Sequence, residues 1–231
     1  MCGRMNISDH EGIQWLLDEL GLILPEDKFT AKYNVSPTAA VWGVLVSRTA
    51  TTLEPMQWGF VPPWAKEGQF KQPLFNARSE TIWEKPSFKN LIRRYRGIVP
   101  VNGFYEWQRP GKTSGGKSTD KTKVANYITV KNKPAMGLAA IIQSHADGYS
   151  QCCLITTEAN TQMQDVHNRQ PVIVPPEAME DWLNDDNPDN VNRCMQPLES
   201  GAFEIRKISD YVNNARNEGP ECLADLESKN N

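Results

Sequence analysis

The second residue of the chain, Cys2, has the clearest potential for chemistry. Loss of Met1 is expected when the next residue is as small as cysteine, and it leaves an α-amine and a thiol on one two-carbon unit. The pKa of an α-amine is about 7.7–8.0, against about 10.4 for lysine, so a useful fraction is unprotonated at neutral pH. Such an amine can attack an aldehyde, and the adjacent thiol can close a five-membered thiazolidine. An N-terminal cysteine at position 2 therefore indicates a protein that binds an aldehyde durably through covalent bonds.

A second motif resembles a phosphate-binding loop. Residues 111–118 (GKTSGGKS) match the G-x-x-x-x-G-K-[ST] pattern of a phosphate-binding loop. That loop needs a strand before it and a helix after it, because the helix N-terminus supplies much of the anion affinity. Here Arg109-Pro110 interrupts the preceding strand, and residues 124–130 resemble another strand. We interpret the segment as a hairpin loop and not as a nucleotide site.

Length and composition describe the protein that must hold Cys2. A chain of 231 residues, 39% of them hydrophobic, is expected to form one domain. We place this domain at residues 1–218, with a flexible loop at 109–123 and a polar tail at 219–231. No apolar run of about 18 residues and no secretory signal is present, so we expect no membrane partner and a cytoplasmic monomer, nucleoid-associated if the source is bacterial.

The cysteines favour neither disulfides nor a metal site. There are five, an odd number without a C-x-x-C pair, so we expect reduced thiols, no structural zinc and no cofactor. The net charge is −3, but residues 1–176 hold 20 basic and 15 acidic side chains. Residues 85–97 contain five basic residues and no acid, which by itself is typical of a solvated helix face. A local basic surface for nucleic acid is therefore compatible with the acidic total.

Hydrophobic patterning predicts short strands with few helices. Ser8 and Glu11 form a capping box before an amphipathic helix at residues 9–20. Two more helices are expected at residues 81–95 and 176–183. Strands are expected at residues 40–47, 53–58, 98–107, 124–130, 135–143, 151–157 and 171–174. This pattern predicts an α+β fold, predominantly antiparallel β and barrel-like, with flanking helices.

Several motifs can join Cys2 if the strands bring them together. They are Met-Cys-Gly-Arg at residues 1–4, Tyr-Asn-Val-Ser-Pro at 33–37, the aromatic and proline cluster at 58–64, and the segments 75–80, 102–107 and 165–171. Together, and in this order, they resemble the SRAP (SOS-response-associated peptidase) family over nearly the whole chain. The resemblance implies a domain that crosslinks to abasic sites in single-stranded DNA during the damage response. It also implies peptidase-like removal of Met1, with the domain itself as one candidate catalyst, and lyase-type chemistry.

The resemblance carries four catalytic positions onto this chain: Cys2, Asn76, Glu106 and His167. Their chemistry suits these roles. His167 can move a proton to open the closed hemiacetal of an abasic sugar, and Glu106 can shuttle a proton as the imine forms. Asn76 offers one acceptor and two donors to orient the amine or the sugar.

Contacts to DNA are expected from further positions that match the family. Arg4, Arg78 and Arg169 can pair with phosphates, while Trp64 and Pro37 can stack on bases or wedge between them. Replication-fork proteins are possible further partners. The chain departs from the family at Asn168 and Gln170, where many members have an acid after the histidine and Met or Arg before the proline.

Two other functions remain open from the sequence. The first is an N-terminal-nucleophile cysteine peptidase or amidohydrolase, in which the Cys2 thiolate attacks an amide and its own amine acts as base. The second is a noncovalent reader of modified DNA bases. The three functions differ in whether DNA becomes bonded to the protein.

Overall fold

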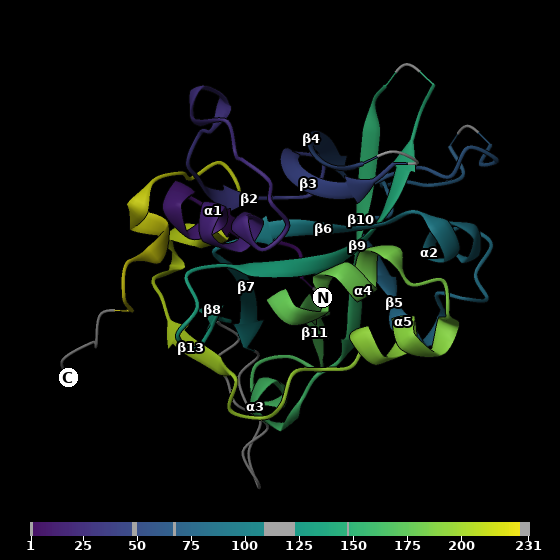
Figure 1. The fold of residues 1–231 in the computed structure, drawn as a ribbon. Helices are drawn as coiled ribbons and strands as arrows, with labels where there is room; N and C mark the ends of the chain where they lie inside the picture. The colour runs from purple at the N-terminus through teal and green to yellow at the C-terminus, as the bar shows by residue number, and fades with distance from the viewer. Residues whose placement is uncertain (1, 48–49, 67, 109–122, 147, 227–231) are drawn as a thin grey trace, which may run out of the picture.

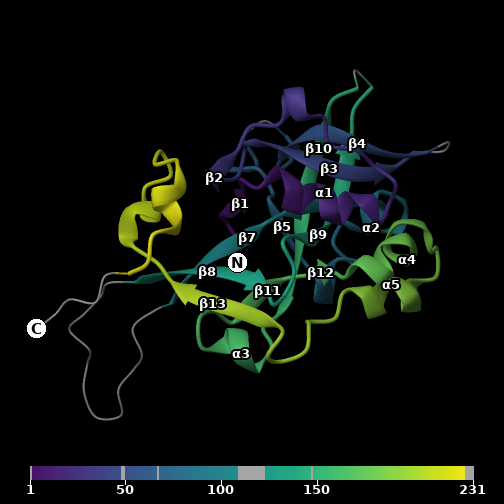
Figure 2. The same cartoon turned by 60° about the vertical axis from the view of Figure 1, so that its left-hand side comes forward.

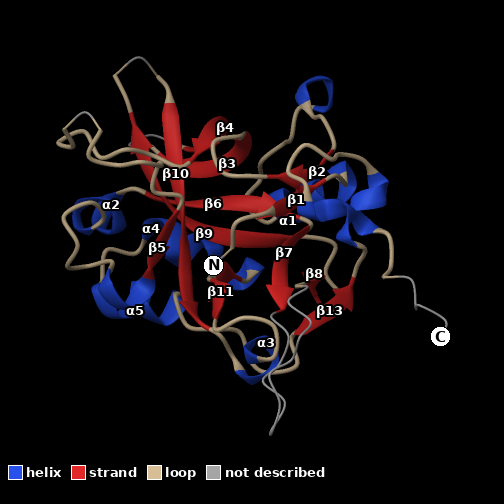
Figure 3. Cartoon of the chain, turned by 180° about the vertical axis from the view of Figure 1, so that it is seen from behind, coloured by secondary structure: helices blue, strands red, loops and turns tan. Residues whose placement is uncertain are grey.

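The structure is a computed structural model that describes residues 2–47, 50–66, 68–108, 123–146 and 148–226. The expected flexible loop, apart from Lys123, and the phosphate-loop match at 111–118 lie outside the described residues. Two sheets make up the body of the protein, and the helices lie around them (Figures 1 and 3).

The larger sheet closes on itself. Its ring runs β10–β4–β3–β6–β9 and back to β10. The ring strands are β3 (Ala40–Val46), β4 (Thr51–Trp58), β6 (Arg96–Val101), β9 (Met136–Ser144) and β10 (Ser150–Glu158). The short strands β5 (Asn76–Arg78), β11 (Arg169–Pro171) and β12 (Ile173–Val174) extend it. Only β10 pairs in parallel among the described strands, with β4 and β5. The predicted α+β, mainly antiparallel and barrel-like fold is confirmed.

The second sheet holds the N-terminus. Its order is β13–β8–β7–β1–β2. The strands are β1 (Met5–Ile7), β2 (Lys32–Val35), β7 (Gly103–Gln108), β8 (Val124–Val130) and β13 (Phe203–Lys207) (Figure 2). Because β1 lies between β2 and β7, all three of its residues are buried. The chain therefore starts beside an interior strand.

The helices are short. They are α1 (His10–Asp18), α2 (Lys89–Arg94), α3 (Thr161–Gln164), α4 (Met179–Asn184) and α5 (Pro188–Cys194). Single 3₁₀ turns occur at Glu26–Lys28, Ser79–Thr81, Pro176–Ala178, Asp210–Asn213 and Pro220–Leu223. α1 buries Ile13, Leu16 and Leu17, the stripe that predicted it. None of the helices in the described residues is long and apolar enough to cross a membrane.

Three predicted elements differ in the structure. The capping box does not form: α1 is capped by Asp9 without a side-chain hydrogen bond, and Asn102 Oδ1 accepts the backbone N–H groups of Ser8 and Asp9 instead. The helix predicted at 81–95 shrinks to α2 after a 3₁₀ turn and irregular turns, consistent with Pro86 having no N–H to donate. The strand predicted at 98–107 divides at Asn102 into β6 and β7, which belong to different sheets.

The end of the described chain packs onto the second sheet. Pro220–Leu223 forms a 3₁₀ turn, and Cys222 is buried. The Glu218 carboxylate accepts hydrogen bonds from the backbone N–H groups of Tyr33 and Asn34. Residues 219–226 therefore do not form the detached polar tail that their composition suggests, because β2 holds the residues just before them. The domain boundary at residue 218 stays a prediction.

We predict that Asn102→Ala lowers the free energy of unfolding by about 2–3 kcal/mol, because it leaves buried polar groups without partners. Besides accepting from Ser8 and Asp9, the Asn102 amide donates to the carbonyl oxygens of Asp9 and Pro134. Urea denaturation measures the change. Asn90→Ala, at an exposed position of α2, is the matched control and should stay within about 0.5 kcal/mol of the wild type. Equal losses in both variants would contradict the role of Asn102.

Candidate active site at the N-terminus

Cys2 lies inside the protein, with none of its surface exposed. Two strands fix its backbone. On one side, the Tyr105 N–H of β7 donates to the Arg4 carbonyl oxygen at 3.0 Å, and this holds the turn between Cys2 and β1. On the other, Asn76 Nδ2 at the start of β5 donates to the Cys2 carbonyl oxygen at 2.7 Å. The N-terminus therefore lies where the two sheets meet.

The amide oxygen of Asn76, Oδ1, is also buried, and it accepts no hydrogen bond from the described residues. A buried acceptor without a donor is costly, so its presence beside the first residues of the chain needs an explanation. An ammonium or amine on the Cys2 α-carbon would provide the donor, since the carbonyl of the same residue is already held by the other half of the amide.

Glu106 lies within electrostatic reach of the Cys2 thiol. Burial raises the pKa of the thiol, and the negative charge of Glu106 raises it further, while a backbone hydrogen bond with Arg4 opposes the shift. Glu106 itself is 4% exposed, in the middle of β7. Both burial and the Glu106 charge therefore favour the protonated thiol.

His167 lies just after the turn that follows α3, and its N–H donates to the Met163 carbonyl oxygen; its place beside Cys2 stays a prediction. Gln108, on the same face of β7 as Glu106, donates to the Asp165 carbonyl oxygen at 2.8 Å and so fixes this turn against the strand. The His167 Nδ1 atom faces the backbone of Arg169: it lies 3.0 Å from the N–H and 3.2 Å from the carbonyl oxygen. A neutral ring can accept from the N–H, and a charged ring can donate to the oxygen. Both protonation states of His167 therefore have a partner.

A fork of hydrogen bonds fixes Arg169. Its Nη1 and Nη2 atoms bind the two Glu80 carboxylate oxygens at 2.6 and 2.9 Å, and Nη2 also donates to the Thr156 carbonyl oxygen at 2.7 Å. Burial alone would raise the pKa of Glu80, but the hydrogen bonds and charge of Arg169 lower it overall. Glu80 was not assigned a role from the sequence, because its partner is 89 residues away.

Arg4 also has protein partners. Its Nη1 donates to Asn34 Oδ1 at 2.6 Å and to the Val212 carbonyl oxygen at 2.9 Å, and its guanidinium lies 5.5 Å from the centre of the Trp107 ring. The Asn34 amide in turn donates to the carbonyl oxygens of Asn214 and Asn217. Arg4 therefore joins the N-terminus to the C-terminal segment, and its expected contact with a phosphate stays a prediction.

The remaining predicted DNA-binding residues lie at the surface to different degrees. Arg78 is exposed at the end of β5, two residues after Asn76. Trp64 is 51% exposed and packs edge-on against Phe70. Pro37 is partly exposed in a turn closed by a hydrogen bond from Ala39 N–H to the Ser36 carbonyl oxygen. These positions leave side-chain surface available to a ligand, but their contacts with DNA stay predictions.

The position before Pro171 has a structural role. Gln170 is 1% exposed, and its Oε1 accepts the backbone N–H of Asn160, the residue that caps α3. Asn168 is exposed. The departure at Gln170 thus helps to hold the helix that precedes His167, whereas nothing in the structure explains Asn168.

Comparison with known proteins gives a consistent result. A family model described as SOS response associated peptidase (SRAP) matches residues 1–215. The abasic site processing protein YoqW of Bacillus subtilis (strain 168) is 32% identical over 232 residues, a match that spans 96% of this chain and 99% of YoqW. The abasic site processing protein HMCES of Mus musculus is 31% identical over 235 residues, spanning 86% of this chain and 66% of HMCES.

A solved structure shares the fold. The crystal structure of a protein from Bacteroides thetaiotaomicron superposes with a TM-score of 0.78 at 22% identity, and covers 97% of this chain and 99% of the other. A second, from Bordetella bronchiseptica, gives a TM-score of 0.69 at 19% identity, over 90% of this chain and all of the other (100%). These two matches show that the ring and the second sheet form a recurring architecture.

We predict that Glu106→Gln lowers the pKa of the Cys2 thiol, because it removes a nearby negative charge while burial remains. Iodoacetamide should then alkylate Cys2 at a lower pH than in the wild type, since the thiolate is the reactive form. Peptide mass spectrometry across a pH series measures this, with both proteins in the same N-terminal form. Glu204→Gln, which alters an exposed carboxylate of β13, is the control. An unchanged profile in Glu106→Gln would contradict the proposed proximity.

Proposed function

Because the chain belongs to the SOS response associated peptidase (SRAP) family, we propose that it captures abasic sites in single-stranded DNA through the amine and thiol of Cys2. One observation supports this most directly: Cys2 is fully buried, and Asn76 Nδ2 donates to its carbonyl oxygen. The relatives named abasic site processing proteins supply the class of substrate. The detailed chemistry follows from the residues at the site.

The first step is removal of Met1. Water hydrolyses the amide between Met1 and Cys2, free methionine leaves, and the new α-amine remains on Cys2. Asn76 is placed to receive it, because Nδ2 already binds the carbonyl of the same residue and Oδ1 can accept from the amine. The amine thereby gains a fixed direction toward an incoming aldehyde.

His167 prepares the aldehyde. An abasic sugar is mostly a closed hemiacetal, so its anomeric hydroxyl must lose a proton and its ring oxygen must gain one. His167 can accept the first and supply the second, because the Arg169 backbone accommodates both its neutral and its charged form. The ring C–O bond breaks and the open aldehyde appears without any net change in protonation.

Glu106 serves the bond-forming steps. The Cys2 amine adds to the aldehyde carbon to give a carbinolamine, and Glu106 exchanges protons so that water leaves and an imine forms. The thiol then adds across the C=N bond: sulfur bonds to carbon, the thiol proton passes to Glu106, and the carboxyl returns a proton to nitrogen. A thiol with a raised pKa needs such a nearby base, and Glu106 is within electrostatic reach.

Single-stranded DNA must lie across the opening of this site. Arg78, exposed beyond Asn76, is the best placed cation for a flanking phosphate, while Trp64 and Pro37 present apolar surface to neighbouring bases. Arg169 and Arg4 hold Glu80 and Asn34, so we assign them mainly to positioning the site. Contacts with replication-fork proteins remain a further expectation.

The peptidase alternative is less well supported. A nucleophilic cysteine works as a thiolate and lies where its pKa is lowered. At Cys2, burial and Glu106 act in the opposite direction. This environment favours addition of a neutral thiol to an imine over attack of a thiolate on an amide. A noncovalent reader of modified bases would have no need for a buried N-terminal cysteine.

We predict that the protein without Met1 forms a heat-stable adduct with an oligonucleotide that carries one abasic site, seen as a shifted band on a denaturing gel. Cys2→Ser should give only a reversible imine, because oxygen closes the ring less favourably. Protein with a tag before Cys2 should give no adduct, since its amine is blocked. Mass spectrometry of the adduct identifies the bonded residue.

Cys194→Ser is the matched control, because it removes a partly exposed thiol on α5 and should leave the adduct unchanged. Turnover of an amide substrate without any DNA adduct would favour the peptidase. Full binding of intact modified DNA by Cys2→Ala, with no adduct in the wild type, would favour the noncovalent reader.

We predict that His167→Ala slows capture of an abasic sugar by about 10²-fold or more, in the range of general acid–base catalysis. A simple open aldehyde needs no ring opening, so its capture should slow much less. Rates of adduct formation with the two aldehydes, measured by stopped time points on gels, give the comparison. Equal slowing of both would remove the ring-opening role from His167.

A further inference from the structure

A row of cations lies on the outer face of α2. The Lys89 N–H donates to the Lys85 carbonyl oxygen at 2.9 Å, which extends the helical turn back to Lys85. Lys85, Lys89 and Arg93 are thus spaced by four residues on one face, about 6 Å apart along the axis. All three are exposed, whereas Leu91 and Ile92 of the same helix are buried.

The row is not neutralised by the protein. Neither of the two ion pairs found in the described part of the chain, Arg169–Glu80 and Arg206–Asp225, includes it. Arg94 beside it is also exposed. The fifth basic residue of the segment, Arg96, has a different role: it is buried and donates to the carbonyl oxygens of Trp182 and Asp185.

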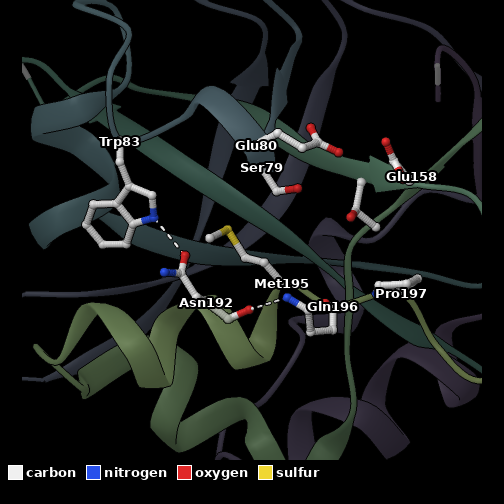
Figure 4. A pocket seen from close by; sticks show the side chains of 9 residues that line it. Ser79, Glu80, Trp83, Glu158, Asn192, Met195, Gln196 and Pro197 are labelled. Atoms are coloured by element: carbon white, nitrogen blue, oxygen red, sulfur yellow. Dashed lines mark hydrogen bonds between the residues drawn. The ribbon is translucent and has the colours of Figure 1, made fainter.

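The third cation of the row has a defined position. The Arg93 guanidinium lies 5.5 Å from the centre of the Trp83 ring. The Trp83 indole N–H donates to Asn192 Oδ1 at 2.8 Å, and both residues line a cavity of about 560 Å³ (Figure 4). Because the hydrogen bond to Asn192 fixes the indole, the ring has a defined orientation for its cation–π contact with Arg93.

The row continues the path that starts at the reactive residue. β5 lies between the N-terminus and α2 in both Figure 1 and Figure 2. Asn76 at its start binds Cys2, and Arg78 at its end is exposed. Residues 78–94 contain five basic and two acidic side chains, and Arg169 pairs with one of the acids, Glu80. This segment therefore has a net positive charge, although the whole chain has a net charge of −3.

We propose that Lys85, Lys89 and Arg93 bind the phosphates of single-stranded DNA on one side of the abasic site. This inference rests on the proposed function, which places the lesion at Cys2. A single strand carries one negative charge per nucleotide, and regularly spaced cations can follow it without reading sequence. Tyr95, 52% exposed just after α2, adds an aromatic face at the end of the row. The site thus gains affinity for the strand on one side without using the catalytic residues.

The test measures noncovalent binding by the full chain with Cys2→Ala, which prevents the adduct. Two oligonucleotides carry a stable abasic analogue, one with a long arm only on the 5′ side and one with a long arm only on the 3′ side. The salt dependence is the slope of a plot of log K against log salt concentration. The triple variant Lys85→Gln, Lys89→Gln, Arg93→Gln should reduce the magnitude of this slope by about 2 for one oligonucleotide, because each lost phosphate contact removes about 0.7. The other oligonucleotide should bind as before.

Two matched proteins keep the result specific. Lys28→Gln, Lys131→Gln, Lys207→Gln removes the same charge from exposed positions elsewhere and should leave both salt dependences unchanged. Lys85→Arg, Lys89→Arg, Arg93→Lys keeps the charge and should retain the wild-type value. Three outcomes would overturn the proposal: equal losses with both oligonucleotides, an equal effect of the distant triple variant, or no effect of the row variant. The last outcome would indicate that the row binds an acidic partner other than DNA.

Failure of the row and failure of the proposed function are distinguishable. With Cys2 present, the row variant should still form the covalent adduct on a short abasic oligonucleotide that has no long arm. If the wild type forms no adduct there, the proposed function fails whatever the row binds. If the wild type forms the adduct and the row variant binds both long-armed oligonucleotides normally, only the row proposal fails.

Discussion

Burial of the chain terminus is the constraint on which the rest of this structure depends. The ends of a chain usually lie in solvent, since they carry charge and make few contacts. Here Cys2 has no exposed surface, and the residues that follow it form the interior strand β1. The hydrogen bond from Asn76 to the Cys2 carbonyl and the one from Tyr105 to the Arg4 carbonyl hold the terminus from two sides. A flexible end thereby becomes a fixed reactive group.

Each sheet contributes one side of the site. The ring sheet supplies Asn76 on β5, and through β11 it supports the turn that carries His167. The second sheet supplies Glu106 on β7. Two hydrogen-bonding side chains connect these segments. Glu80 accepts from Arg169, and Gln108 donates to the Asp165 carbonyl oxygen. These hydrogen-bonding partners fix the backbone that carries the proposed catalytic side chains.

Much of this could be read from the sequence, and the failures have physical causes. The long strands β3, β4, β8, β9 and β10 have enough apolar and β-branched residues to be predicted alone. Strands β1, β2, β5 and β13 were missed, because three to five residues give little periodic signal and their pairing partners are distant. Asn102 divides two sheets, but in the sequence it lies within one continuous apolar run. Family motifs predict roles for Cys2, Asn76, Glu106 and His167, and these roles stay predictions, whereas the ion pair of Glu80 depends on Arg169, a partner that only the folded chain brings near.

The interior position of β1 also sets an order of events during synthesis. β7, one of its two neighbouring strands, ends at Gln108, so β1 cannot be enclosed until that residue has left the ribosome. At about 5–20 residues per second, the N-terminus stays open for roughly 5–20 s. An aminopeptidase that acts on the nascent chain within this interval meets Cys2 before the fold encloses it. Once the sheet has closed, Cys2 and all three residues of β1 are buried.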